Sequence, residues 1–233
     1  MSADFSPGRG DQVSFDGRVI PILFENEDVL AVHKPEGLAS IPEGRPGRDC
    51  LLSLLAALVP CKIYVVHRLD KDVSGVILFA KNAVAHKCLN EQFNQRRVRK
   101  TYIALTHGVM EMDGGRIDKP LRRFGSGRMG VDLARGKPCV TEFRVEERLG
   151  AYTLVQVHPI TGRRHQIRVH LYSIGHPIVG DRLYGEKRVQ LRFPRLMLHA
   201  QKIAFRLPTG EEVEIEADPP PSFREVMARM EKL

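Results

Sequence analysis

The 233-residue sequence predicts an α+β fold built on a mixed, mainly antiparallel β-sheet. Strand-like segments outnumber helix-like ones, and most of them are joined by short turns typical of hairpins. The segments do not alternate regularly between strand and helix, as a parallel sheet would require. Because no repeat and no sharp break in composition divides the chain, we expect a flexible lead-in over residues 1–17 and one folded domain over residues 18–233.

The first elements of this domain are a hairpin and a helix. Residues 19–24 and 29–32 are rich in β-branched and apolar residues, and an acidic turn separates them. Structure is therefore expected to begin near Val19. Asp49 is placed to cap a helix that ends near Pro60.

Three strands and a second helix follow. Residues 64–66 and 76–80 are strand-like, and the latter segment is apolar throughout, which indicates burial on both faces. Asn82 is a good cap for a helix that runs to about Arg97. Residues 102–105 form the next predicted strand.

The second half begins with an irregular segment. Residues 113–138 are rich in Gly and Arg and show little periodicity, so we expect a flexible excursion. Residues 140–148 and 152–157 predict a hairpin. A helix is expected over residues 164–174, with Gly175 as the residue that follows it.

The C-terminal part predicts one more strand pair and a helix. Residues 197–207 and 213–216 are strand-like and flank a Thr-Gly turn. Ser222 and Glu225 have the spacing of a capping box and are expected to open the last helix.

The charge of the chain favours a polyanionic partner. Lys and Arg number 36 against 28 Asp and Glu, which gives a net charge of +8. Basic domains of this size often bind nucleic acid, although a mildly basic protein without such a partner has a similar count. Clustering of the basic residues favours the first interpretation: Arg96, Arg97, Arg99, Lys100, Arg122, Arg123, Arg163 and Arg164.

Composition argues against a secreted or membrane protein. The four cysteines are widely spaced, which predicts neither a disulfide framework nor a zinc site. The longest apolar run, residues 51–59, is far shorter than the ~20 residues needed to span a bilayer. We expect a cytoplasmic protein with no membrane contact and, in the absence of an obvious oligomerisation segment, a monomer.

The first candidate for chemistry is the charged loop at residues 67–70, which lies between two predicted strands. Loops at strand ends commonly present functional side chains, and Asp70 could act as a nucleophile or a base. The simpler interpretation is a turn capped by Asp70 or Asp72, with Arg68 in a surface ion pair.

The second candidate is the segment at residues 161–170, in which five of ten residues are Arg or His. A helix start flanked by Arg is suited to phosphates. Arg164 and Arg168 are four apart and share a helix face, so one could pair with a buried carboxylate. A solvated basic face is the alternative. His165 and His170 lack the spacing of metal ligands, and we expect no metal site. The residues expected to bind substrate here are Arg163, Arg164, His165 and Gln166.

Together these segments resemble the RluA family of pseudouridine synthases. The matches occur in one order along most of the chain, from about residue 22 to 219: residues 67–70, 100–102, 161–170, 175–178, 180–181 and 196–200. The resemblance implies a mainly antiparallel sheet with a central cleft flanked by helices and loops. It implies isomerisation of uridine in ribosomal or transfer RNA to pseudouridine, without cofactor or metal.

The resemblance also implies individual roles. Asp70 falls on the family's catalytic aspartate, Tyr102 on the tyrosine that stacks on the target base, and Arg168 on the arginine that pairs with the aspartate. Arg68 falls where an arginine fills the space left by the flipped nucleotide. Leu198 falls where an apolar side chain lines the uracil pocket.

Two other functions are compatible with parts of the sequence. A non-catalytic RNA-binding protein would explain the basic clusters but not the set of Asp70, Tyr102 and Arg168. A hydrolase or transferase of small phosphorylated substrates would explain the basic helix start. It would also need a Gly-rich phosphate loop or a Ser–His–Asp arrangement, which the sequence lacks.

Overall fold

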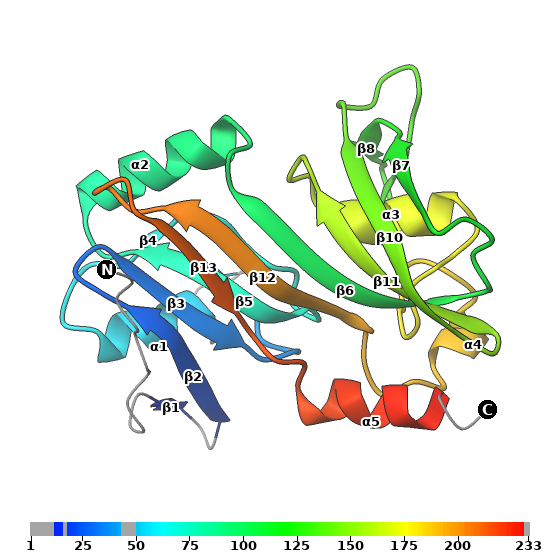
Figure 1. Ribbon diagram of the computed structural model, residues 1–233, viewed down its shortest axis with the longest axis horizontal. Coiled ribbons are helices and arrows are strands. Elements are labelled where there is room, and N and C mark those ends of the chain that lie inside the picture. Colours follow the sequence, from blue (N-terminus) through cyan, green and yellow to red (C-terminus); the bar gives the residue numbers. More distant parts are fainter. Residues whose placement is uncertain (1–11, 16–17, 43–49, 231–233) are drawn as a thin grey trace. The chain divides into compact units, whose positions relative to one another are not determined.

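The computed structural model describes residues 12–15, 18–42 and 50–230 and contains two compact units (Figure 1). Unit 1 comprises Met1–Val98 and Lys202–Ala217, and unit 2 comprises Arg99–Gln201 and Asp218–Leu233. The α+β class and the mainly antiparallel sheet predicted from the sequence are confirmed. The single domain over residues 18–233 stays a prediction.

Unit 1 is built on strands in the order β1-β2-β3-β5-β12, with β4 paired to β5 and β13 paired to β12. All residues of β5 are buried, as its apolar sequence predicted. The predicted hairpins β2–β3 and β12–β13 are confirmed. The strand bounds are β1 Gln12–Phe15, β2 Arg18–Glu25, β3 Val29–Lys34, β4 Tyr64–Val65, β5 Ser74–Ala80, β12 Leu198–Arg206 and β13 Glu212–Glu216.

Strand β1 begins earlier than the expected start of structure near Val19. Residues 12–15 alternate between polar and apolar, and they pair antiparallel with β2 from Gln12 opposite Pro21 to Phe15 opposite Arg18. The expectation failed because the segment is short, so its strand character depends on pairing with β2.

Helices α1 (Leu51–Leu58) and α2 (Ala83–Asn94) belong to unit 1. Asn82 caps α2 as predicted, accepting a hydrogen bond from the backbone N of Ala85 at 2.8 Å. Asp49 lies outside the described residues. The cap of α1 is Cys50, which takes the place expected for a carboxylate.

Unit 2 contains strands in the order β12-β6-β11-β10-β7, and Figure 1 shows β10 and β11 beside helix α3. The hairpin β10–β11 is confirmed, and its turn places Gly150 at a φ of 57°. The strand bounds are β6 Arg99–His107, β7 Gly114–Asp118, β8 Leu121–Arg123, β9 Met129–Val131, β10 Val140–Leu149 and β11 Tyr152–Pro159.

The expectation of a flexible excursion over residues 113–138 is wrong. Strand β7 pairs with β10, and β8 pairs with β9 in a hairpin. Several glycines of the segment serve close packing. A Cβ on Gly136 would collide with the carbonyl oxygen of Asp132, and one on Gly114 would lie 2.9 Å from the carbonyl oxygen of Phe143. Side-chain periodicity is weak here because glycines are needed at these contacts.

The helices of unit 2 are α3 (Gln166–Ser173), α4 (Lys187–Gln190) and α5 (Pro221–Met230). Gly175 follows α3 at a φ of 87°, as predicted. The proposed capping box of α5 is wrong, because Pro221 takes the first helical position and Ser222 lies inside the first turn. Among the described residues, none of the helices has the length and apolar content to cross a bilayer.

Candidate functional site

The candidate residues are divided between the two units. Arg68 and Asp70 lie in unit 1, in the loop between β4 and β5. The other candidates lie in unit 2: Tyr102, Arg163, Arg164, His165, Gln166, Arg168 and Leu198.

The backbone on the N-terminal side of Asp70 is held by one hydroxyl. Ser40 Oγ donates to the carbonyl oxygen of Leu69 at 2.8 Å and accepts from the Leu69 backbone N at 3.1 Å. The Asp70 carbonyl oxygen accepts from the Val73 backbone N at 3.1 Å, which closes a turn after the carboxylate. The loop is thus fixed in conformation where Asp70 is presented.

On the C-terminal side of Asp70, the loop is held by a fully buried lysine. Lys34 Nζ donates to the carbonyl oxygens of Pro35 at 2.7 Å, Leu38 at 2.8 Å and Lys71 at 3.0 Å. The Gly37 backbone N donates to the same Lys71 oxygen at 2.9 Å. Sequence reasoning missed Lys34, whose only signal was a lysine at the end of a buried strand.

The histidine that begins the loop is also anchored. His67 Nε2 accepts from the Leu78 backbone N at 2.9 Å, so this ring nitrogen carries no proton. The ring stacks on Phe93 with centroids 5.0 Å apart. Arg68 is exposed and Asp70 is partly exposed. The loop therefore has a rigid base and presents its two candidate side chains at the surface of unit 1.

Tyr102 lies on strand β6 in unit 2 and is paired with Val157 of β11. Lys100 is two residues earlier and so shares a face of the strand with Tyr102. Burial lowers the pKa of Lys100 to about 8. Leu198, at the start of β12, is almost fully buried.

Gln166 shapes the loop that precedes α3. Its Oε1 accepts from Thr161 Oγ1 at 2.8 Å and from the Arg163 backbone N at 2.9 Å. Its Nε2 donates to the Val140 carbonyl oxygen at 2.7 Å and to Thr141 Oγ1 at 2.9 Å. These four bonds use the full capacity of an amide and indicate an organising role. Contact of Gln166 with substrate stays a prediction.

Arg168 forms a buried, bidentate ion pair with Asp181. Both its Nε and its Nη2 donate to the carboxylate at 2.7 Å, and the two side chains are 4% and 0% exposed. Asp181 also accepts from the backbone N of Leu183 at 2.9 Å and of Tyr184 at 3.1 Å. Sequence reasoning expected one arginine here to pair with a buried carboxylate but gave Asp181 no role.

His165 lies immediately before α3 with a φ of 52°, which is unusual for a residue other than glycine. Arg164 Nε donates to His165 Nε2 at 3.4 Å, so Nδ1 carries the proton. This Nδ1 donates to Tyr184 Oη at 2.9 Å. Arg163 and Arg164 are exposed. The geometry presents two arginines to solvent while the histidine is directed to Tyr184.

His170 is buried, and both of its ring nitrogens form hydrogen bonds within the protein. Thr141 Oγ1 donates to Nδ1 at 2.8 Å, and Nε2 donates to the Lys119 carbonyl oxygen at 2.9 Å. Burial lowers the pKa of His170, which favours this neutral form. Elsewhere in residues 12–15, 18–42 and 50–230, His, Cys, Asp and Glu side chains do not gather in threes that could hold a metal ion.

Comparison with known proteins assigns the chain to one family. The family described as RNA pseudouridylate synthase matches residues 28–173. Over 193 residues the chain is 40% identical to the "Dual-specificity RNA pseudouridine synthase RluA" of Vibrio cholerae, covering 81% of this chain and 78% of that protein.

Two further comparisons agree. The chain is 39% identical over 220 residues to the "Ribosomal large subunit pseudouridine synthase C" of Pasteurella multocida, covering 90% of this chain and 67% of that protein. The solved structure "Human RNA Pseudouridylate Synthase Domain Containing 4" matches with a TM-score of 0.76 and 27% identity, covering 90% of this chain and 92% of that one.

Proposed function

The chain belongs to the RNA pseudouridylate synthase family and converts uridine in RNA to pseudouridine, and we propose that Asp70 is the carboxylate that carries this reaction. The observation that supports Asp70 is the way its loop is held. Ser40 fixes the backbone of the residue before it and Lys34 fixes the backbone of the residue after it, while Asp70 itself is partly exposed. A preorganised acidic side chain at a rigid surface is suited to attack on a bound substrate.

The reaction needs a charged carboxylate at one step. The bond from the sugar C1′ to uracil N1 breaks, the base rotates, and C1′ bonds to uracil C5. C5 then loses its hydrogen as a proton and N1 takes up a proton, so the product is an isomer of uridine. Asp70 would either attack C1′ or remove the 2′ proton, and both steps require the ionised form.

Arg168 is proposed to keep Asp70 ionised and oriented. A guanidinium beside a carboxylate favours its charged form and orients it through directional N–H donors. The five N–H groups of a guanidinium are enough to serve Asp181 and a second carboxylate together. Asp181 would then hold Arg168 in place for Asp70.

The remaining candidates are proposed to bind the flipped nucleotide. Removing a base from its stack costs a few kcal/mol. Tyr102 would offset this by stacking on the uracil, which contributes about 1–3 kcal/mol per base. Arg68 would fill the gap in the RNA, and Leu198 would line the base pocket.

The substrate is proposed to be ribosomal or transfer RNA, with Arg163, Arg164 and His165 near its phosphates. Two relatives support this, since one is named as dual-specificity and the other as a ribosomal large subunit enzyme. The proposal also includes action as a monomer in the cytoplasm.

The test is tritium release from RNA labelled at C5 of uridine. Asp70→Asn keeps the size of the side chain and removes its charge, so release should fall to background while RNA binding persists. Asp72→Asn, in the exposed part of the same loop, is the matched control and should retain release.

Substantial product from Asp70→Asn would refute the assignment of Asp70. Release from free UMP would contradict an RNA substrate and favour an enzyme of small phosphorylated compounds. Binding of RNA by the wild-type protein without any release would favour the non-catalytic alternative.

A further inference from the structure

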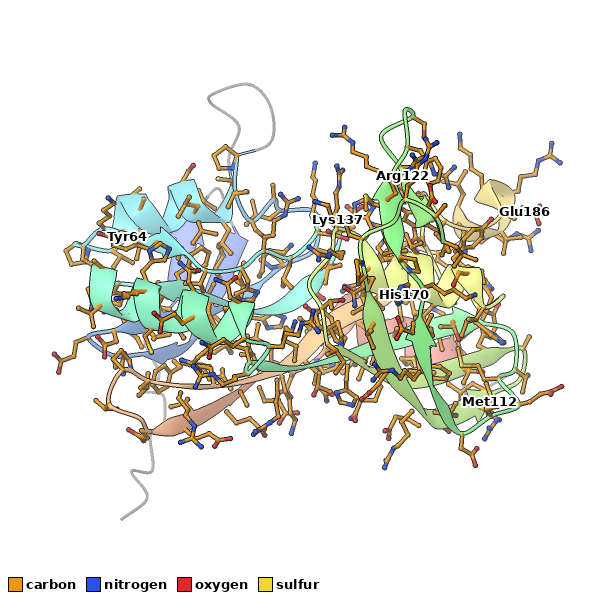
Figure 2. All side chains as sticks on the ribbon, turned by 90° about the horizontal axis from the view of Figure 1, so that it is seen from above. Tyr64, Met112, Arg122, Lys137, His170 and Glu186 are labelled. Carbon is orange, nitrogen blue, oxygen red and sulfur yellow. The ribbon has the colours of Figure 1, made fainter. Side chains whose placement is uncertain are left out.

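Tyr184 is a buried aromatic residue beside α3, the helix on which Figure 2 labels His170. Its side chain packs in a cluster with Leu121 of β8 and Val169 of α3, and the residue is 2% exposed. The backbone of Tyr184 is fixed as well, because Asp181 Oδ1 accepts from its N–H group at 3.1 Å. Both the ring and the hydroxyl group of Tyr184 are therefore held in defined positions.

The ring of Tyr184 lies against the guanidinium of Arg168. Arg168 Cζ is placed over the ring, 5.2 Å from its centroid. The Asp181 carboxylate binds the same guanidinium at two N–H groups and also accepts from the Tyr184 backbone N, so one carboxylate places both partners. A cation over an aromatic face is attracted by the ring, most strongly where water is excluded. The ring and the carboxylate together restrict the orientation of Arg168.

The hydroxyl group of Tyr184 holds the residue that precedes α3. Its Oη accepts from His165 Nδ1 at 2.9 Å, and the two rings meet edge to face with their centroids 5.7 Å apart. His165 has a φ of 52°, a conformation that a residue other than glycine keeps only where its surroundings enforce it. Arg163 and Arg164 come directly before it and are exposed. The hydroxyl group therefore helps to fix the backbone that presents these two arginines.

We infer that Tyr184 is a positioning residue with two separable effects: its ring orients Arg168, and its hydroxyl group orients the loop of residues 163–165. The inference rests on the proposed function, in which Arg168 serves the reaction and the loop binds RNA. Loss of the ring should therefore slow the chemical step. Loss of the hydroxyl group alone should weaken RNA binding and leave the chemical step unchanged.

The test separates the two effects by substitution. Tyr184→Phe removes only the hydroxyl group, whereas Tyr184→Leu also removes the aromatic face and keeps an apolar side chain in the cluster. Tyr172→Phe and Tyr172→Leu are the matched controls, since Tyr172 lies on α3, is 49% exposed and has its ring 6.2 Å from that of Tyr184. The probes are ribosomal and transfer RNA transcribed in vitro with tritium at C5 of uridine. Binding gives the Kd, and tritium release at saturating RNA gives kcat.

Tyr184→Phe should raise the Kd about fivefold, the usual effect of losing one buried hydrogen bond, with kcat within about twofold of the wild type. Tyr184→Leu should raise the Kd to the same extent. Its kcat should also fall about tenfold, because the buried Arg168 guanidinium loses a cation–π contact. Both Tyr172 variants should match the wild type in Kd and in kcat.

A second background tests whether the hydroxyl group acts through His165. Glycine adopts a positive φ at little cost, so His165→Gly removes the need for this hydrogen bond. In the His165→Gly background, Tyr184→Phe should therefore change the Kd by less than about twofold. The hydroxyl oxygen also accepts from the Met129 backbone N at 3.2 Å. An equal rise in Kd in both backgrounds would assign its effect to Met129 and overturn the inference for the hydroxyl group.

An unchanged kcat in folded Tyr184→Leu would overturn the role of the ring, and an unchanged Kd in Tyr184→Phe would overturn that of the hydroxyl group. Urea unfolding identifies any variant that has lost its fold. Tyr184→Phe keeps the ring in the cluster, so its Kd and kcat test the inference even where Tyr184→Leu unfolds. Failure of the proposed function has a different signature. Tritium release from Asp70→Asn would refute the proposed catalytic carboxylate but leave the comparison of Kd values intact.

Discussion

Two buried charged residues, Lys34 and Asp181, hold the candidate side chains in their places. Each is satisfied by several partners, as burial of a charge requires. Lys34 donates to three carbonyl oxygens in unit 1. Asp181 accepts four hydrogen bonds in unit 2, two of them from Arg168. Both residues act through a neighbour: Lys34 fixes the backbone just after Asp70, and Asp181 binds the Arg168 guanidinium.

At this scale we predict that Asp181→Asn destabilises the protein by about 3–5 kcal/mol, because it removes the charge of the buried carboxylate that forms a bidentate ion pair with Arg168. Urea unfolding measures the change. Asp113→Asn is the control, because the Asp113 side chain is 89% exposed and its ion pair with Arg148, at 2.7 Å, lies at the surface. Loss of this pair should change stability little. An equally small change in both variants would contradict the prediction.

At the scale of elements, the candidate residues lie mainly where strands and helices end. Asp70 follows β4, and the segment from Arg163 to His165 precedes α3. Such positions combine a rigid scaffold with exposed side chains. The backbone N–H and C=O groups of such loops must then form hydrogen bonds with side chains elsewhere. Lys34 donates to the Lys71 carbonyl oxygen, and Gln166 accepts from the Arg163 backbone N.

Lys34→Met tests this support of the loop after β4. Methionine fills much of the lysine volume but removes the Nζ donor from the carbonyl oxygens of Pro35, Leu38 and Lys71, although Lys71 keeps its hydrogen bond from the Gly37 backbone N. This loss should cost about 2–4 kcal/mol of stability. Tritium release should fall as well, because the Asp70 loop loses its anchor. Lys87→Met, on the exposed face of α2, should keep both properties. Full activity of Lys34→Met would contradict an anchoring role.

At the scale of the whole molecule, the chain passes between the two units at residues 98/99, 201/202 and 217/218. Strand β12 contributes its first residues to unit 2 and its last residues to unit 1. The candidate residues are divided in the same way, with Asp70 in unit 1 and Tyr102 and Arg168 in unit 2.

The stability of the folded molecule should decrease in mild acid. Burial lowers the pKa of His170 below its ordinary value of 6.5, so the unfolded chain binds a proton more readily than the folded one. The free energy of unfolding is therefore at its full value above pH 6.5 and falls as the pH drops below it. His107, whose pKa is lowered mainly by burial, acts in the same direction.

Unfolding in urea at several pH values measures this effect. In His170→Gln the decline below pH 6.5 should be shallower than in the wild type, because one acid-sensitive group is absent. Unchanged steepness would show that His170 does not couple protonation to folding.

The sequence alone determined the features that depend on neighbouring residues. The hairpins β2–β3, β10–β11 and β12–β13, the buried strand β5 and the Asn82 cap were predicted from alternation, turns and caps. The family, too, was identified from short segments around Asp70, Tyr102 and Arg168, and the comparisons confirm it.

Only the tertiary structure decided how distant residues satisfy one another. Lys34 and Lys71 are 37 positions apart, and no local pattern reveals that a buried ammonium meets that carbonyl. The pairing of Arg168 with Asp181 and the hydrogen bond from the Met129 backbone N to Tyr184 Oη are of the same kind. The conformation of residues 121–137 depends on contacts with α3 and Tyr184, because a Gly- and Arg-rich segment has too few apolar residues to specify its own conformation.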